Sequence, residues 1–418
     1  MSDTQDRARE VLKSALTSPY SDFYRLKYGN DSGAERAISG GDWGAVPFLT
    51  RGEIQQVPVW DRIFFPDKKT INAIRPTSGT SGKGALLMPR AYDEKDTKRW
   101  QAWFFNALPI RRSASFSGAQ YLYYYSNTER IDTLQLIPGD IPLSAALVER
   151  YRPDVLAGFP YALVALAPML SAAASSRIQV VQLFGELCTA SDWRFLKAYF
   201  RDSIFFAEYS SIEAQTPIAG TCPVAARSYE LLVHPLTASA HVELVDESGA
   251  AVTETGKSGE IVITVLRPTA LPLIRYKTGD SARIVRTDCP CGATTPLLQI
   301  EGRLEIDRLR IRGGELHTVE VDRVLTSLAQ YLTGYEFEVR FAELMQDGLL
   351  VPRVTIVCAL QPGVTPEHME RLIASALRVA PDKTYAEGVA AGEYAPLRVV
   401  NRVGEPGVQG KRVRIVRE

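Results

Sequence analysis

The chain has few cysteines and few histidines for its length, five and four respectively in 418 residues. So few cysteines do not make a disulfide framework, and a reducing cytoplasm is therefore the expected setting. Acidic and basic residues balance at 48 each, so net charge gives no reason to expect a nucleic-acid partner or an anionic membrane. We expect a small neutral or anionic substrate instead.

The sequence also lacks segments for export or for insertion into a bilayer. Residues 1–7 are charged and carry no apolar stretch of the signal-peptide kind, so export is not expected. The longest apolar run, 161–174, contains Pro168 and is too short to span a membrane, so we predict a buried helix there. Signatures of the Gly-x-Ser-x-Gly and His-Glu-x-x-His types are absent, which disfavours a hydrolase.

One stretch is suited to binding a polyphosphate. Residues 77–83 read Thr-Ser-Gly-Thr-Ser-Gly-Lys, with two glycines, four hydroxyls and a lysine. Glycine lets backbone N–H groups approach phosphate oxygens, while hydroxyls and an ammonium add donors and positive charge. The stretch does not have the Walker spacing, and for it alone a solvated Ser/Gly turn is at least as good an interpretation.

Four later motifs follow this loop in a fixed order. They read Glu-Tyr-Ser-Ser-Ile-Glu at 208–213, Leu-Ile-Arg-Tyr-Lys-Thr-Gly-Asp at 273–280, Gly-Arg at 302–303 and Gly-Lys at 410–411. With these motifs, residues 70–418 resemble the adenylate-forming superfamily of acyl-CoA synthetases. The phenylacetate-CoA ligase-like branch is the most similar, because of Pro-Leu-Ile-Arg-Tyr at 272–276 and Cys-Pro-Cys-Gly at 289–292. The resemblance implies an AMP-forming ligase that uses ATP and Mg²⁺ to activate a small aromatic carboxylic acid for transfer to coenzyme A.

The pattern of expected elements fits an α/β protein. Strand-like runs at 179–184 and 203–206 alternate with helical segments such as 193–200, which predicts parallel α/β layers. Residues 241–245 and 259–264 alternate with period two around a turn and predict a β-hairpin. The first seventy residues begin with a helix that carries Val11, Leu12 and Ala15 on one face, but they indicate no function.

The pattern of predicted helices and strands changes after Arg303. Apolar stripes at 321–328 and 369–376 predict two amphipathic helices, and strand-like runs occur at 336–341, 353–360, 397–403 and 412–416. We therefore expect a large N-terminal adenylation domain with mixed β-sheets and helices, residues 1–304, and a small α+β C-terminal domain, residues 305–418. By resemblance, the small domain is mobile and carries the catalytic lysine.

The resemblance also implies a role for individual residues. Tyr209 would pack on the adenine, Asp280 would accept hydrogen bonds from the ribose with Arg303 close by, and Glu213 would hold Mg²⁺. Lys411 would bridge the acid and the α-phosphate, so Lys411 and Glu213 are the predicted catalytic residues. The residues predicted to bind the nucleotide are Ser78, Gly79, Thr80, Ser81, Gly82, Lys83, Gly185, Glu186, Glu208, Tyr209, Ser210, Asp280 and Arg303.

Each of these residues has a structural alternative, such as a packed core ring for Tyr209. The chain also departs from the family pattern, because Ala85 stands where a lysine is common, Ser210 replaces a glycine, and Lys277 replaces an arginine. One extra residue after Arg303 leaves both Glu305 and Asp307 as alternatives for the hinge carboxylate.

Two further groups of residues are candidates for ligand binding. Some members of the resembled branch carry zinc, and Cys222, His234, Cys289 and Cys291 would give a closed Cys₃His site of the structural kind. Reduced, buried thiols are the alternative.

The acid pocket is predicted at strand ends. The aromatic side chains expected there are Phe159, Tyr161 and Phe184, which would offer flat walls to an aryl acid, with ordinary core packing as an equal alternative. Delivery of the acyl group to an acyl or peptidyl carrier protein or to an amine is an alternative to coenzyme A. A nucleotide-binding protein without turnover is less favoured, because Lys411, Glu213 and Asp280 are all retained.

Overall fold

The computed structural model describes residues 3–64, 71–77, 86–91, 110–116, 132–228, 231–267, 269–304, 307–311, 314–346, 349–380, 382–402 and 415–417. Within these ranges, no helix combines the length and the apolar character needed to cross a membrane.

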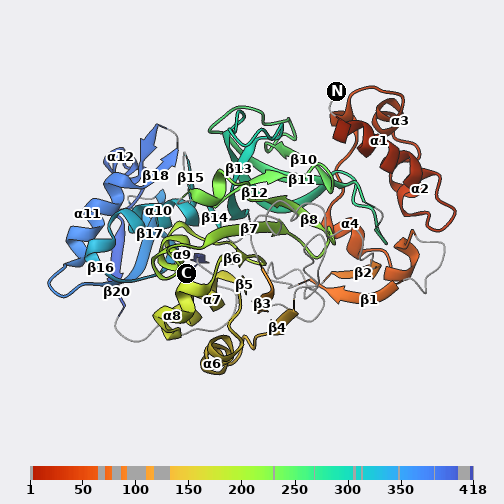
Figure 1. The fold of residues 1–418 in the computed structure, drawn as a ribbon. Coiled ribbons are helices and arrows are strands. Elements are labelled where there is room, and N and C mark those ends of the chain that lie inside the picture. The colour runs from red at the N-terminus through yellow and green to blue at the C-terminus, as the bar shows by residue number, and fades with distance from the viewer. Residues whose placement is uncertain are drawn as a thin grey trace.

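A sheet of eleven strands organises the larger part of the described chain, in the spatial order β10-β11-β12-β13-β9-β8-β7-β6-β5-β3-β4 (Figure 1). Strands β4, β3, β5, β6 and β7 run parallel to one another, and every pairing from β7–β8 across the sheet to β11–β10 is antiparallel. The predicted α/β class, parallel layers and β10–β11 hairpin are thereby confirmed. The strands are β3 (Arg112–Ser115), β4 (Asp132–Gln135), β5 (Val155–Gly158), β6 (Val180–Leu183), β7 (Ile204–Ser210), β8 (Pro217–Gly220), β9 (Leu232–Pro235), β10 (Ala240–Val245), β11 (Ser258–Val265), β12 (Tyr276–Arg286) and β13 (Leu297–Arg303).

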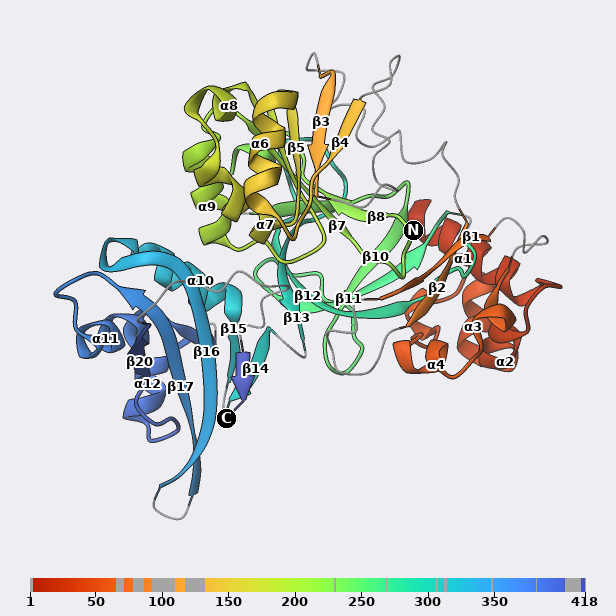
Figure 2. The ribbon, with the colours of Figure 1, turned by 90° about the horizontal axis from the view of Figure 1, so that it is seen from below.

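Four helices pack against the parallel part of this sheet (Figure 2). Leu156, Val181 and Phe205 from the strands form one buried core with Leu163 and Trp193 from the helices. Burial of these apolar surfaces is the main favourable term that fixes the strand ends in space. The helices are α6 (Ile141–Tyr151), α7 (Pro160–Leu166), α8 (Ala172–Arg177) and α9 (Ala190–Tyr199).

The prediction of one helix across the apolar run 161–174 is wrong. Helix α7 ends at Leu166, a 3₁₀ turn spans Ala167–Met169, and α8 begins at Ala172. The Ser171 side chain accepts a hydrogen bond from the Ala174 N–H at 3.2 Å and so caps the new helix. The predicted burial holds for α7, where Leu163 and Leu166 are fully buried, but not for the turn that follows, where Met169 is 52% exposed.

The N-terminal helices pack on the opposite end of the molecule from the C-terminal elements (Figures 1 and 2). The predicted first helix is confirmed, and its Leu12 and Ala15 are buried in the same core as β10, β11 and β12. The Thr4 hydroxyl hydrogen-bonds His241 Nδ1 at 3.0 Å, and the Tyr28 hydroxyl donates to the Ile274 carbonyl at 3.3 Å. This segment therefore supports the strands that carry the motifs. Its elements are α1 (Asp3–Leu16), α2 (Phe23–Tyr28), α3 (Ser32–Ile38), α4 (Arg51–Gln55) and the hairpin β1 (Ile71–Pro76) and β2 (Leu87–Ala91).

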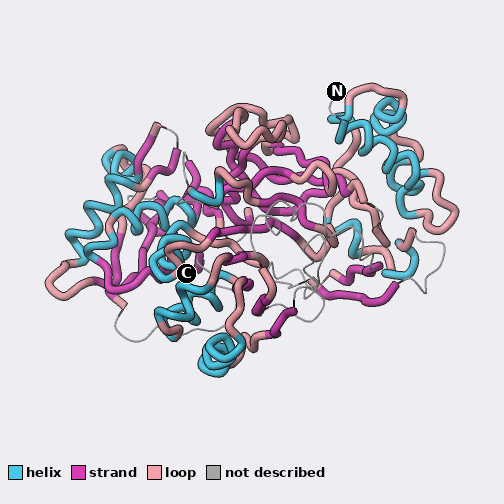
Figure 3. Tube along the Cα trace, viewed as in Figure 1, coloured by secondary structure: helices cyan, strands magenta, loops and turns pink. Residues whose placement is uncertain are grey.

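Beyond β13, the chain forms a second unit that contains both helices and strands (Figure 3). Its four-stranded sheet has the order β20-β17-β16-β21. Val324, Val339, Ile356 and Ile373 lie in its separate core, and both predicted amphipathic helices are present. The domain boundary near residue 305 stays a prediction. The elements are β14 (Arg308–Ile311), β15 (Gly314–His317), α10 (Thr318–Ser327), β16 (Leu332–Gln346), β17 (Leu349–Leu360), α11 (Pro366–Ala376), β18 (Arg378–Ala380), β19 (Lys383–Thr384), α12 (Tyr385–Ala390), β20 (Arg398–Asn401) and β21 (Ile415–Arg417).

Candidate functional site

The candidate site lies where the parallel strands β5, β6 and β7 end. Phe159 follows β5, Phe184 follows β6, and Tyr209 is the penultimate residue of β7. The carboxyl ends of parallel strands meet at one edge of a sheet, which is where open α/β sheets bind ligands.

Tyr209, Asp280 and Arg303 form one hydrogen-bonded and charged group. The Tyr209 hydroxyl donates to Asp280 Oδ2 at 2.6 Å. Asp280 and Arg303 lie opposite each other in the β12–β13 register, and Arg303 Nε is 3.6 Å from Asp280 Oδ1. The residues predicted to contact the adenine and the ribose are thus brought together from three separate motifs.

The protonation of this group follows from its burial. Burial raises the pKa of Asp280 to about 6, although the Arg303 charge and the Tyr209 hydrogen bond oppose the rise. Burial and the neighbouring Asp280 hold the pKa of Tyr209 well above its usual range, so the phenol stays a donor. At neutral pH, Asp280 is anionic and able to accept hydrogen bonds, and it gains a proton in mildly acidic solution.

Glu208 precedes Tyr209 in β7 and belongs to a different environment, because successive strand residues point to opposite faces. Burial raises the pKa of Glu208 to about 7, and the Gln182 amide, at 3.5 Å from Oε2, opposes the rise. Gln182 is 1% exposed, and its Oε1 has no hydrogen-bond partner among the described residues. Sequence reasoning missed Gln182, because its neighbours in β6 are apolar and nothing in them indicates a hydrogen bond to Glu208. The predicted role of Glu208 in nucleotide binding stays a prediction.

Glu213, the predicted Mg²⁺ residue, is held by an arginine from the N-terminal segment. Arg51 Nη1 donates to Glu213 Oε1 at 3.1 Å, and Arg51 Nη2 donates to the Thr77 hydroxyl oxygen at 2.7 Å. Sequence reasoning missed Arg51, since its partners lie 162 and 26 positions along the chain and no local motif marks it.

Gly185 and Glu186 shape the end of β6. Gly185 has a φ of +84°, and a Cβ there would lie 2.5 Å from Phe159 Cε1, so only glycine fits this close approach. Glu186 Oε1 accepts a hydrogen bond from the Tyr161 N–H at 2.8 Å at the first turn of α7. Ser210 ends β7. That these three residues bind the nucleotide stays a prediction.

The three aromatic residues predicted to line the acid pocket contact one another. The Phe159 and Tyr161 rings stack with centroids 5.8 Å apart, and the Phe159 and Phe184 rings meet edge to face at 5.6 Å. All three are partly exposed, unlike the fully buried rings of the core. Flat, partly exposed rings of this kind can pack against an aromatic ligand.

The predicted metal ligands also come together. One ligand atom from each of Cys222, His234, Cys289 and Cys291 can be chosen so that all four lie within 4.8 Å of one another. Cys222 Sγ and Cys289 Sγ are 3.9 Å apart, which is too far for a disulfide and compatible with two ligands of one ion.

The surroundings of these side chains suit a bound cation. His234 Nδ1 lies 2.9 Å from the Thr295 carbonyl oxygen, which places the ring proton on Nδ1 and leaves the Nε2 lone pair facing Cys291 Sγ at 3.4 Å. Burial lowers the pKa of His234, which favours the neutral form that binds metals. The Ala225 N–H donates to Cys222 Sγ at 3.3 Å.

Some predicted residues lie outside the described ranges, namely 78–83, Glu305 and Lys411. Of the two hinge alternatives, the structure describes Asp307, whose Oδ2 accepts a hydrogen bond from the Arg303 N–H at 2.9 Å. A Cβ on Gly302, where φ is +104°, would lie 2.6 Å from this oxygen, so the glycine makes room for Asp307. Which residue is the hinge stays a prediction.

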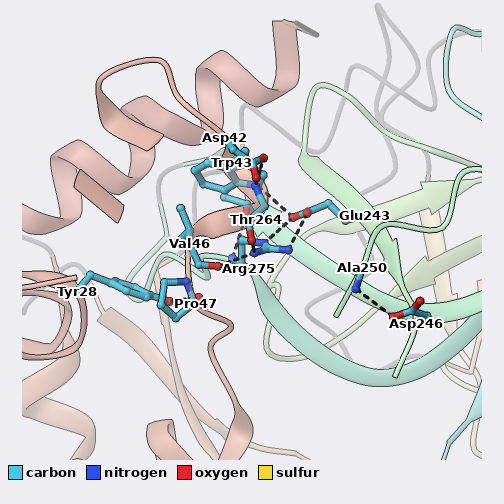
Figure 4. A network of polar contacts seen from close by, with 11 residues as sticks. Tyr28, Asp42, Trp43, Val46, Pro47, Glu243, Asp246, Ala250, Thr264 and Arg275 are labelled. Carbon is cyan, nitrogen blue, oxygen red and sulfur yellow. Dashed lines mark hydrogen bonds and ion pairs between the residues drawn. The ribbon is translucent and has the colours of Figure 1, made fainter. Parts of the chain in front are cut away.

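Arg275, in the middle of the 273–280 motif, has a structural role (Figure 4). It is 2% exposed, and its guanidinium donates to the carbonyls of Gly44 and Val46 at 2.6 and 2.5 Å. It also pairs with Glu243, with N–O distances of 3.1 and 3.2 Å. The adjoining backbone completes the link, because the Leu49 N–H donates to the Arg275 carbonyl at 3.0 Å. Arg275 thus joins the N-terminal segment to the strand that carries Asp280.

Comparisons with known proteins found similar sequences and similar folds. No protein-family model matches the chain. It is 24% identical over 353 residues to the phenylacetate-coenzyme A ligase of Aromatoleum evansii, covering 79% of this chain and 76% of that ligase. It is 35% identical over 99 residues to the phenylacetate-coenzyme A ligase of Thermus thermophilus, but this match covers 23% of this chain and only 22% of the relative's length.

A solved structure extends the likeness to the fold. The 2-hydroxyisobutyryl-CoA ligase in its postadenylation state, in complex with R3-HIB-AMP, superposes with a TM-score of 0.72 at 18% identity, covering 99% of this chain and 89% of that one. The chain has this ligase fold, and its resemblance to the adenylate-forming superfamily and to the phenylacetate-CoA ligase-like branch is confirmed.

Proposed function

We propose that the protein is an ATP-dependent, AMP-forming ligase that activates a carboxylic acid as an acyl-adenylate and transfers the acyl group to coenzyme A. The convergence of Tyr209, Asp280 and Arg303 carries this proposal, because three separate motifs form one group at the strand ends. The names of the two sequence relatives, and the acyl-adenylate in the structural neighbour, support it.

The chemistry explains why such a site is needed. A carboxylate is a poor acyl donor because its leaving group would be oxide. When a carboxylate oxygen attacks the α-phosphorus of ATP, a C–O–P link forms, the bond to pyrophosphate breaks, and AMP becomes the leaving group when a thiol attacks the carbonyl. The protein must hold two anions in line and offset the charge that develops on the phosphates.

In this scheme Tyr209 packs against the adenine while its hydroxyl orients Asp280. Asp280 accepts hydrogen bonds from the ribose, and Arg303 adds positive charge beside it. Lys411 and the loop 78–83 would neutralise the phosphates.

Glu213 has the chemistry to hold Mg²⁺. Its side chain is 12% exposed, and among the described residues it has a hydrogen bond at Oε1 alone, from Arg51. Mg²⁺ prefers hard carboxylate oxygens and usually keeps several waters, so one carboxylate is enough beside a triphosphate. When bound, the ion would neutralise the β- and γ-phosphates.

The acid is proposed to be aromatic, of the phenylacetate, benzoate or anthranilate type. The partly exposed cluster of Phe159, Tyr161 and Phe184 supports this class. Aromatic rings favour offset or edge contacts with one another, and the cluster offers both a face and an edge to a ligand.

The Cys₃His group is proposed to bind a structural zinc ion. Four ligands fill a tetrahedral site and leave no position open for substrate. Zinc, when bound, would join β9, which carries His234, to the turn with Cys289 and Cys291 and to the segment with Cys222.

A panel of aryl and short aliphatic acids tests the proposal. We expect AMP release that depends on an aryl acid and on coenzyme A, with a thioester as product. Slow release of adenylate with no thioester would instead indicate a carrier-protein or amine acceptor. No acid-dependent AMP release or pyrophosphate exchange with any acid would contradict the ligase function.

The Lys411→Ala variant tests the predicted catalytic lysine. We expect it to abolish acid-dependent ATP–pyrophosphate exchange while Mg·ATP still binds, because the variant removes the group that offsets charge at the α-phosphate. Exchange at the wild-type rate would refute the assigned role.

A further inference from the structure

Arg51 connects two residues that the proposed reaction needs close together. Its guanidinium donates to Glu213 Oε1 at 3.1 Å and to Thr77 Oγ1 at 2.7 Å. The Arg51 and Glu213 side chains are only 19% and 12% exposed, so water screens this ion pair less than a surface pair. Thr77 is the residue immediately before the predicted phosphate loop.

The backbone that carries Arg51 is firmly placed. Thr50 and Glu53 form a capping box, in which the Thr50 N–H donates to Glu53 Oε2 at 2.7 Å. Glu53 also pairs with Lys27 of α2. One residue before the cap, the Leu49 carbonyl accepts a hydrogen bond from the Lys277 N–H at 2.9 Å. The start of α4 is therefore fixed to the strand that contains Asp280.

Glu213 and Thr77, two partners of Arg51, can each make one further bond to a ligand. Among the described residues, only Arg51 bonds the Glu213 carboxylate, and it does so at Oε1, which leaves Oε2 for a metal ion or its water. Thr77 Oγ1 accepts from Arg51 and, at 3.0 Å, from the Leu86 N–H. A hydroxyl has two acceptor positions and one hydrogen, so Thr77 can add a further bond only as a donor.

The charge of Arg51 matters as well as its shape. Glu213 and Asp280 are both acidic, and the Glu213 charge is one of the influences that raise the pKa of Asp280. A guanidinium on Glu213 offsets this repulsion before any metal ion is present, and its planar fork holds Glu213 Oε1 and Thr77 Oγ1 in a fixed arrangement.

We propose that Arg51 is a positioning residue for Mg·ATP: it fixes the Glu213 carboxylate beside Thr77 so that the metal and the triphosphate meet a preorganised site. This inference rests on the proposed ligase function. It assigns a role in the reaction to the N-terminal segment, for which the sequence indicates none.

Arg51→Gln tests the inference, with binding measured by isothermal titration calorimetry for Mg·ATP and for metal-free AMP. We expect the Kd of Mg·ATP to rise about tenfold to a hundredfold, the amount a lost charged hydrogen bond implies. The Kd of AMP should change less than about twofold, because AMP carries neither the metal nor the β- and γ-phosphates. A general structural defect would weaken both ligands together.

Three further variants complete the test. Arg51→Lys should recover only part of the Mg·ATP affinity, since an ammonium lacks the two-pronged geometry. Thr77→Val removes the second partner with little change of shape and should also weaken Mg·ATP selectively. Arg25→Gln is the matched control, because it removes an exposed ion pair of the same segment, with Asp22, and should leave both Kd values unchanged.

The outcomes separate the two proposals. If the wild-type protein binds no Mg·ATP, both the ligase function and the role of Arg51 are refuted. If the wild type binds Mg·ATP and Arg51→Gln binds it equally well, or loses AMP to the same extent, the role of Arg51 is overturned while the ligase function stands.

Discussion

Replacement of Arg275 should destabilise the protein, because it removes the contacts that join the N-terminal segment to the strand with Asp280. Arg275→Met keeps an apolar stem but removes the guanidinium, which donates to Gly44, Val46 and Glu243. Glu243 would retain one described hydrogen bond, from Trp43 Nε1 at 3.0 Å. Removal of one partner from a buried ion pair costs about 3–5 kcal/mol, because the remaining charge stays buried without compensation.

The surroundings place the expected loss within that range. Arg275 is 2% exposed and Glu243 is 13% exposed, so water can replace the lost contacts only in part. The guanidinium also lies 4.2 Å from the centroid of the Phe48 ring, a contact that methionine replaces only partly. We expect the free energy of unfolding to fall by about 4 kcal/mol.

Urea denaturation at pH 7, followed by tryptophan fluorescence, measures this loss, since Trp43, one of five tryptophans, donates to Glu243. Lys277→Met is the matched control: the Lys277 side chain is 30% exposed and pairs with Glu260 at 2.8 Å, so its loss should cost less than about 1 kcal/mol. Glu243→Gln combined with Arg275→Met should recover part of the stability, because no unpaired charge is then buried. Equal losses for Arg275→Met and Lys277→Met would refute the reasoning.

Two further predictions concern pH and metal. Burial raises the pKa of Asp280 to about 6, against roughly 4 in an unfolded chain. Between about pH 4 and 6 the native state therefore binds more protons than the unfolded chain. The contribution of Asp280 to stability is present below about pH 4 and is lost as pH rises through 6. In the proposed scheme AMP binds the ionised carboxylate, so the affinity for AMP should fall about tenfold per pH unit below 6, and calorimetry of Asp280→Asn should show a flat profile. Cys289→Ser should lower both the zinc content, measured by mass spectrometry, and the melting temperature. It should leave the kcat of the folded fraction within about twofold, since a closed site does not catalyse. An unchanged melting temperature after loss of zinc would contradict a structural role.

Much of the fold follows from local patterns in the chain. The period-two runs of 241–245 and 259–264 form the β10–β11 hairpin, and the apolar stripes of 321–328 and 369–376 form α10 and α11. These patterns are reliable because one buried face sets the spacing of apolar residues. The resemblance carried by the motifs implied that Tyr209, Asp280 and Arg303 share a site, and the structure brings them together.

Tertiary packing decided what local patterns do not encode. Arg51 contacts Glu213, 162 positions away in the sequence, and Arg275 contacts Gly44, 231 positions away. The residues that flank each arginine therefore give no indication of either contact. Gln182 reads as part of an apolar strand, yet the neighbouring strand places Glu208 beside it. A hydrogen bond between side chains depends on where two elements lie in space, whereas periodicity records only which face of one element is buried.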